Sequence, residues 1–137
     1  MKLKLKIQGN ELALKNLDKA KTKFVEFLED EIMLTTDNIQ TKAISRVRVD
    51  KGFLKGSIYK EVKDLNGVVG ARQKYAPYVE FGTGGMVEVP QGLEDYSSQF
   101  KGKGIKQVNL PSRPFLFNSA FEEVTAMRER VLKATKE

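Results

Sequence analysis

The chain has 137 residues, with 24 Lys and Arg against 18 Asp and Glu and a formal net charge of +6. This length suits one domain with a modest core, and we expect residues 1–137 to form a single unit. Cys and His are both absent, which excludes disulfides, metal sites built on thiolate or imidazole, and the commonest general base near neutral pH. No apolar run approaches the roughly 18 residues that a membrane span requires, so we expect no membrane partner.

The charges fall in blocks along the chain. Basic stretches at 1–23 and 42–63 flank residues 26–37, whose charged side chains are all acidic. These blocks are compatible with an ordinary solvated surface, or with complementary patches that steer subunits together in a fixed register. The amino-terminal stretch lacks the continuous apolar centre of a secretory signal, which predicts synthesis in the cytoplasm.

The first half of the chain predicts a strand and a long helix. Residues 2–8 alternate Leu or Ile with Lys, the period-two pattern of a half-buried strand. From Glu11 to Val47, apolar side chains recur at helical spacing. The polar run 35–38 interrupts this spacing and predicts a kink or a break. The narrow apolar stripe is typical of a core helix, and a helix this long can also present it to a partner.

A β-hairpin is predicted next. Gly52 and Gly56 bracket a turn, and residues 57–63 have the pattern of a strand. Asn66-Gly67 is a strong hairpin turn signal, followed by a returning strand over 68–72.

Three charged residues near this hairpin suggest an alternative chemistry. Asp50, Glu61 and Lys63 have in outline the Asp and Glu-x-Lys arrangement that holds Mg²⁺ in many nucleases. Glu-x-Lys arises readily by chance in a chain so rich in both residues, and solvent-facing charges are the simpler interpretation. A Mg-dependent nuclease or a small basic nucleic-acid-binding protein stays the alternative function.

The stretch 75–85 reads YAPYVEFGTGG and combines aromatic residues, one carboxylate and a run of glycines. It predicts a short helix over 75–81, because Pro77 fits the first helical turn and Gly82 suits the carboxy-terminal cap. A phosphate loop would need Gly-Lys-Ser/Thr before a helix, and the sequence does not provide it here.

The remainder predicts a long loop and a final helix. Residues 83–112 have the composition of a flexible loop, with a β-ribbon considered around 86–89 and 105–110. Beyond them, Phe117, Phe121, Val124, Arg128 and Leu132 keep helical spacing and predict a helix that packs on the sheet. The predicted fold class is therefore α+β, with a long amino-terminal and a carboxy-terminal helix on a small, mainly antiparallel sheet.

Three motifs in this order resemble the head–tail joining or tail-completion family of minor tail proteins from long-tailed bacteriophages and prophages. They are Gly52–Ile58 (GFLKGSI), Tyr75–Thr83 (YAPYVEFGT) and Arg113–Leu116 (RPFL), ahead of a carboxy-terminal helix. The resemblance covers about residues 11–130, and YAPYVEFGT is its most specific part. Gly56 and the long segment 84–112 depart from the family pattern.

The resemblance implies a structural, non-enzymatic protein of the virion neck or tail without a cofactor. It implies a homo-oligomeric ring, with a hexamer as the expected form, that joins or completes the tail during virion assembly. The implied partners are head-closure, tail-terminator or tail-tube proteins, and genomic DNA that passes non-specifically through the ring.

The predicted subunit or partner interface lies in the second and third motifs. Glu80 requires a cation if it is buried, and Arg113 is the preferred partner, with Arg72 second. The alternative is that the short helix fills the core of its own subunit. Lys101, Lys103 and Lys106 could face DNA, the acidic block of a neighbour, or solvent. The predicted interface residues are Tyr75, Pro77, Tyr78, Glu80, Phe81, Gly82, Thr83, Arg113, Pro114 and Phe115.

Overall fold

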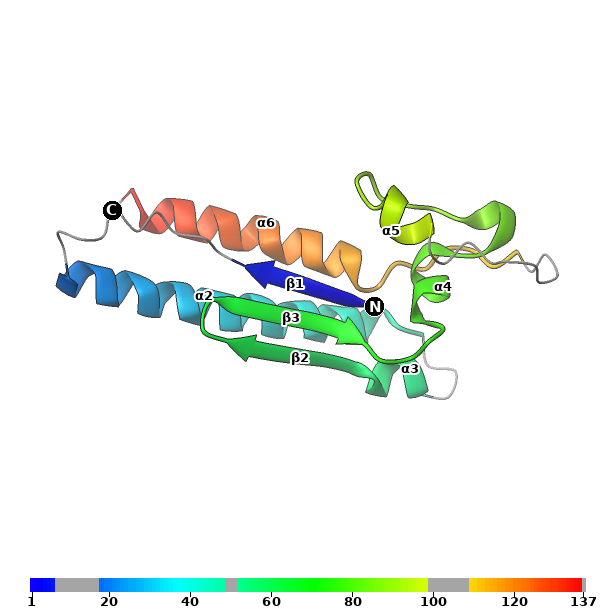
Figure 1. Ribbon diagram of the computed structural model, residues 1–137, viewed down its shortest axis with the longest axis horizontal. Coiled ribbons are helices and arrows are strands. Elements are labelled where there is room, and N and C mark those ends of the chain that lie inside the picture. Colours follow the sequence, from blue (N-terminus) through cyan, green and yellow to red (C-terminus); the bar gives the residue numbers. More distant parts are fainter. Residues whose placement is uncertain (7–17, 49–51, 99–108, 137) are drawn as a thin grey trace.

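The protein is described here by a computed structural model over residues 1–6, 18–48, 52–98 and 109–136 (Figure 1). The fold class is α+β, as predicted, with two long helices and a small antiparallel sheet. Along the chain the elements are β1 (Lys2–Lys6), α2 (Asp18–Arg46), α3 (Phe53–Gly56), β2 (Ile58–Lys63), β3 (Asn66–Ala71), α4 (Ala76–Phe81), the 3-10 turn η1 (Gly84–Met86), α5 (Glu94–Ser98) and α6 (Phe117–Ala134). That residues 1–137 form one domain stays a prediction.

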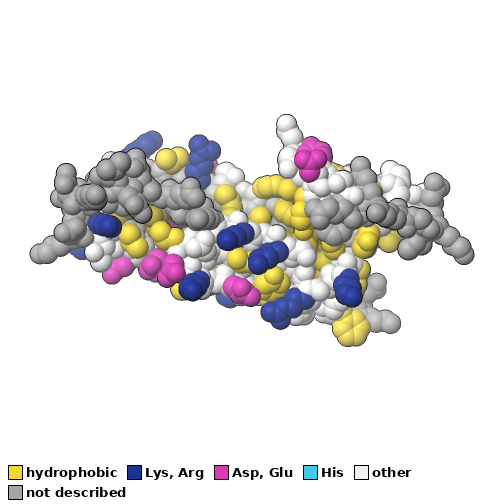
Figure 2. All heavy atoms as spheres, viewed as in Figure 1, with side chains coloured by type: hydrophobic (Ala, Val, Ile, Leu, Met, Phe, Trp, Pro, Cys, Tyr) yellow, Lys and Arg dark blue, Asp and Glu magenta, His cyan; other side chains and the backbone are white. Residues whose placement is uncertain are grey.

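The sheet has the strand order β1-β3-β2, and both pairings are antiparallel. Leu3 pairs with Val69 and Ile58 with Ala71, so these apolar residues lie on one face, toward α2. Lys2 and Lys4 point to the other face and are exposed, as their alternation with Leu predicts. Figure 2 shows several Lys and Arg side chains over the strands on this open side.

The hairpin of β2 and β3 is confirmed, but its turn lies earlier than predicted. Lys63 pairs with Asn66, so Asp64 and Leu65 form the turn and Asn66-Gly67 already belongs to the strand. Asp64 adopts a left-handed backbone, with φ of 52°, a conformation that Asp tolerates better than most residues.

Helix α2 runs without interruption from Asp18 to Arg46, so the predicted break at 35–38 is wrong. Polar residues there have hydrogen-bond partners within the uninterrupted helix and on α6. The Thr36 hydroxyl donates to the Ile32 carbonyl at 2.7 Å, and Asn38 donates to Glu123 of α6 at 3.1 Å. Gly67 of β3 lies against Thr36 with no room for a Cβ atom, which lets the strand approach the helix closely.

Helix α6 lies along α2 (Figure 1), and α2 is its main neighbour rather than the sheet. Ion pairs connect the two helices, with Arg46 to Glu122 at 2.6 Å and Arg130 to Glu31 at 2.7 Å. The predicted buried stripe on α6 is wrong beyond Phe117. Phe121, Val124, Arg128 and Leu132 are all exposed, while the buried side is formed by Phe117, Ser119, Ala120 and Glu123.

The main core joins the carboxy-terminal half of α2 to the sheet, α3, α4 and the segment before α6. Its buried members are Ile39, Ala43, Val47, Leu54, Ile58, Val69, Ala71, Ala76, Phe115, Leu116 and Ala120. The described part of 83–112 contains η1 and α5 instead of the predicted strand at 86–89. Residues 105–108 of the second predicted ribbon strand lie outside the described residues. Among the helices of the described ranges, none combines the length and apolar character needed to cross a membrane.

Candidate subunit interface around α4

The short helix α4 forms where it was predicted, with Pro77 in its first turn and Gly82 as its carboxy-terminal cap. Gly82 has φ of 78° and ψ of −174°, a region that is nearly exclusive to glycine. A Cβ atom there would lie 2.5 Å from the Met86 carbonyl oxygen and 2.7 Å from the Ser112 nitrogen. Gly82 therefore permits close contact between the end of α4 and the segment leading to α6.

Glu80 is the central side chain of this arrangement and is only 1% exposed. Its Oε2 accepts hydrogen bonds from the backbone N–H groups of Phe115 at 2.8 Å and Leu116 at 3.0 Å, and its Oε1 accepts one from Phe117 at 2.9 Å. These amides precede or begin α6, where the first N–H groups have no partner within the helix. Leu116 at the cap position provides no side-chain hydrogen bond. Glu80 thus caps a helix that begins more than thirty residues later.

Burial raises the pKa of Glu80 above its ordinary value, while the three amide hydrogen bonds and the charge of Arg46 act in the opposite direction. The positive end of the α6 dipole also favours a carboxylate at this position. The predicted ion pair between Glu80 and Arg113 is wrong, because the described groups around the carboxylate are backbone amides. Arg72, the second predicted partner, instead lies over the ring of Tyr59, 4.6 Å from its centroid.

The inner side of α4 also contributes to an aromatic cluster. The ring of Phe81 stacks on Phe117 with centroids 5.7 Å apart, and Tyr96 of α5 contacts both rings edge-on at 6.3 Å and 6.0 Å. Pro77, Phe81, Gly82 and Phe115 are buried in the subunit itself. The inner side of α4 therefore fills the core of its own subunit, which is one of the two alternatives that the sequence allows.

The outer side of α4 and its flanks remains accessible. Tyr75 is 42% exposed and Tyr78 36% exposed. Arg113 is exposed, and Thr83 and Pro114 are partly exposed. The interface role predicted for all ten residues stays a prediction, and these members are the ones that a partner could reach.

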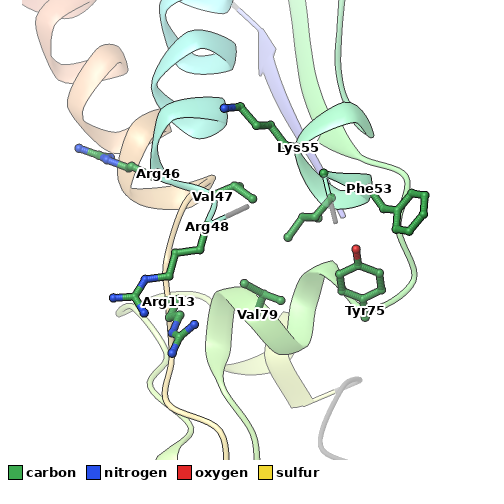
Figure 3. A pocket seen from close by; sticks show the side chains of 10 residues that line it. Arg46, Val47, Arg48, Phe53, Lys55, Tyr75, Val79 and Arg113 are labelled. Carbon is green, nitrogen blue, oxygen red and sulfur yellow. The ribbon is translucent and has the colours of Figure 1, made fainter. Parts of the chain in front are cut away.

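A pocket opens beside Tyr75 and Arg113, between the end of α2, the short helix α3 and α4 (Figure 3). Its floor is apolar, from Val47, Leu54 and Val79. Among the described residues, no carboxylate lines the pocket. Its lining includes four basic side chains, those of Arg46, Arg48, Lys55 and Arg113. In Figure 3 the Arg48 and Arg113 guanidinium groups lie at one side and the Phe53 and Tyr75 rings at the other. We call this site the basic pocket.

Only one of these cations is engaged within the described part of the subunit. Arg46 binds Ser119 at 3.0 Å and Glu122 at 2.6 Å. Arg48, Lys55 and Arg113 have no side-chain partner among the described residues. The basic pocket therefore concentrates positive charge that the described residues leave unneutralised.

Sequence reasoning identified Tyr75 and Arg113 but missed the other members of the pocket. Phe53 is 62% exposed, although an aromatic residue inside a tight turn is most simply expected to fill the core. Arg48 and Lys55 lie in the basic block 42–63, which gave no means of distinguishing them from its other cations. The bracketing glycines were the available signal, because they present Phe53 on an exposed turn.

Of the remaining predicted residues, the structure describes only Glu61 and Lys63. Glu61 and Lys63 are exposed on β2, and Asp50 lies outside the described residues, as do Lys101, Lys103 and Lys106. Within the described ranges, no group of three or more carboxylates is placed to hold a metal ion.

Comparison with known proteins decides the family. The family model described as "Bacteriophage HK97-gp10, putative tail-component" matches residues 13–82, just over half of the chain. The chain belongs to this family of phage tail components. The match includes α2, α3, the β2–β3 hairpin and α4 with Glu80, and it ends at Gly82. It confirms the resemblance seen in the sequence motifs and makes the chain a structural component of a phage tail, and so of the virion.

The other comparisons add no closer relative. No curated protein and no solved structure matches the chain. Arg113 and α6 lie beyond the residues that the tail-component model matches, so the match includes only part of the basic pocket.

Proposed function

We propose that this tail component is a subunit of the head–tail connector or upper tail, where copies assemble as a ring that joins or completes the tail. A hexamer is the form we propose for the ring. Its partners are head-closure, tail-terminator or tail-tube proteins, and genomic DNA passes through its opening without sequence-specific contacts. The role is mechanical and non-enzymatic, and the chain is made in the cytoplasm of the bacterial host before it enters the virion.

The observation that carries this proposal is the family match together with an accessible, aromatic and basic surface beside α4. Tyr and Arg are enriched at the centres of protein interfaces, where they combine apolar area with directional hydrogen bonds. Tyr75, Tyr78 and Arg113 provide this combination next to a helix whose inner side is fixed by Glu80. A rigid support for exposed contact residues lowers the entropic cost of binding.

The proposal is tested by deleting the gene from the phage or prophage that encodes the chain and examining the particles by electron microscopy. We expect DNA-filled heads and separate tails, with joining restored when the chain is supplied from a plasmid. Normal joined virions in the absence of the chain would contradict the proposal.

A further inference from the structure

The basic pocket has the properties of a binding site for an acidic partner. Arg48, Lys55 and Arg113 lie around one apolar floor without a described counter-charge. An anionic surface that enters this pocket is attracted by all three cations. The ligand therefore has to bring negative charge.

The ligand also has to bring apolar surface. Phe53 and Tyr75 are exposed at the rim of the pocket, and Val47, Leu54 and Val79 form its floor. A nucleic-acid backbone would satisfy the cations but leave most of this apolar area in water. A protein segment that carries carboxylates next to aliphatic side chains would satisfy both.

Such a segment exists on the same chain, in the amino-terminal half of α2. Glu26, Glu29 and Asp30 are exposed, and no described residue forms an ion pair with them. Met33, 54% exposed, and Leu34, 44% exposed, follow directly. The spacing places these five residues along one side of the helix. We call them the acidic face of α2, and Figure 2 shows acidic side chains gathered near that end of the molecule.

The acidic face cannot reach the basic pocket of its own subunit. Arg46 lies sixteen positions after Asp30 in the same continuous helix, which corresponds to about 24 Å at 1.5 Å per residue. Figure 1 shows the start of α2 and the helices α3 and α4 at opposite ends of the molecule. Two complementary surfaces at opposite ends can meet only between different copies.

We propose that the basic pocket of one copy receives the acidic face of α2 from a second copy. The contact uses different surfaces on the two copies, so it is head-to-tail, and repeating it generates a closed ring when the rotation per copy closes. This inference rests on the proposed ring and assigns the two surfaces that build it. This contact would explain the alternation of basic and acidic blocks along the sequence, because opposite charges on the two surfaces fix how neighbouring copies are oriented.

The test reverses charge on each surface separately and then on both. The variants are Arg48→Glu with Lys55→Glu in the pocket, and Glu29→Lys with Asp30→Lys on the acidic face. Each is supplied to the phage or prophage that lacks the gene, and infectious particles are counted. We expect each reversal to lower the titre at least about tenfold, because every contact in the ring is changed, and the chain carrying all four changes to recover most of the loss.

Matched controls separate this charge pairing from general effects of charge. Lys63→Glu and Glu129→Lys reverse exposed charges outside both surfaces, and we expect titres near the wild-type value. The thermal unfolding midpoint of each purified variant shows whether it still folds. Only variants that unfold at the wild-type temperature enter the comparison, and Arg48→Gln with Lys55→Gln replaces any pocket reversal that does not.

Several outcomes would overturn the inference. Either reversal could leave the titre unchanged, or the combined variant could be as defective as the single reversals. The wild-type chain could bind a labelled DNA duplex, while the pocket reversal and the combined variant both fail to bind it. That result would assign the pocket to nucleic acid. If the chain is required for joining but the reversals assemble normally, the inference fails and the proposed function stands. A chain that never enters virions overturns both.

Discussion

The two sides of α4 differ sharply in what they contact. On the inner side, Glu80 and Phe81 are almost completely buried, and their partners are the backbone and rings at the start of α6. On the outer side, Tyr75 and Tyr78 are exposed, and Tyr75 lines the basic pocket, where every cation except Arg46 lacks a described side-chain partner. A helix of six residues is therefore both a structural connection within the subunit and the support of a surface for other proteins. Substitutions on the two sides should separate stability from assembly.

The largest effect is expected from Glu80→Ala. It leaves three buried N–H groups without acceptors and creates a cavity, and each unsatisfied donor costs on the order of 1–3 kcal/mol. We expect the free energy of unfolding to fall by roughly 3 kcal/mol or more, with water in the cavity offsetting part of the loss. Chemical denaturation measures this, and a loss below about 1 kcal/mol would contradict the capping role of Glu80.

Gly82→Ala tests whether the close contact at the end of α4 is needed. The added Cβ atom would meet backbone atoms at 2.5 to 2.8 Å in a conformation that disfavours side chains. We expect a loss of about 2–3 kcal/mol in the free energy of unfolding. Gly85→Ala is the matched control, because its Cβ would have no neighbour closer than 3.9 Å. Equal effects of the two changes would show that the contact at Gly82 is not strained.

Glu80→Gln tests the charge of the buried carboxyl group separately from its shape. The raised pKa of Glu80 means that the folded protein binds this proton more tightly than the unfolded chain. Relative to the Gln variant, the wild-type free energy of unfolding should therefore decrease as pH rises from the ordinary value of 4.5 through the raised folded-state pKa, and level off above it. Denaturation of both proteins over a series of pH values measures the difference. An increase over that window would mean that the amide hydrogen bonds outweigh burial.

The smallest effect on stability is expected from Arg113→Ala. Its side chain is exposed and has no described partner, so the free energy of unfolding should change by less than about 0.5 kcal/mol. Combined with Glu80→Ala, the two changes should add, since the two groups do not form a pair. A coupling energy above about 1 kcal/mol between Glu80 and Arg113 in the double-mutant cycle would instead support an ion pair between them.

Elements with strong local patterns could be predicted from the sequence. The alternation of Leu and Lys placed β1, and Pro77 with Gly82 delimited α4, because these signals depend only on neighbouring residues. The polar run in α2 misled the prediction, since its hydrogen bonds to α6 and to the preceding helical turn arise only in the folded protein. Phe121 and Leu132 misled it on α6, where spacing alone could not show which side meets α2.

The role of Glu80 shows why the site was only half predictable. A carboxylate among aromatic residues indicated that Glu80 would require a partner if it were buried. Its partners could not be predicted, because the nearest of them lies 35 residues away and every residue except Pro has a backbone N–H group, whatever its side chain. The one available hint was the lack of Ser, Thr, Asp or Asn directly before Phe117, where a helix normally has its cap.

The most direct test of the connector role is to locate the chain in purified virions. Gold-labelled antibody against a tagged, functional copy can be imaged by electron microscopy, with the copy number determined by quantitative mass spectrometry of the same particles. We expect label at the junction of head and tail and a copy number that corresponds to a single ring. Absence from purified virions, or label distributed along the whole tail, would contradict it.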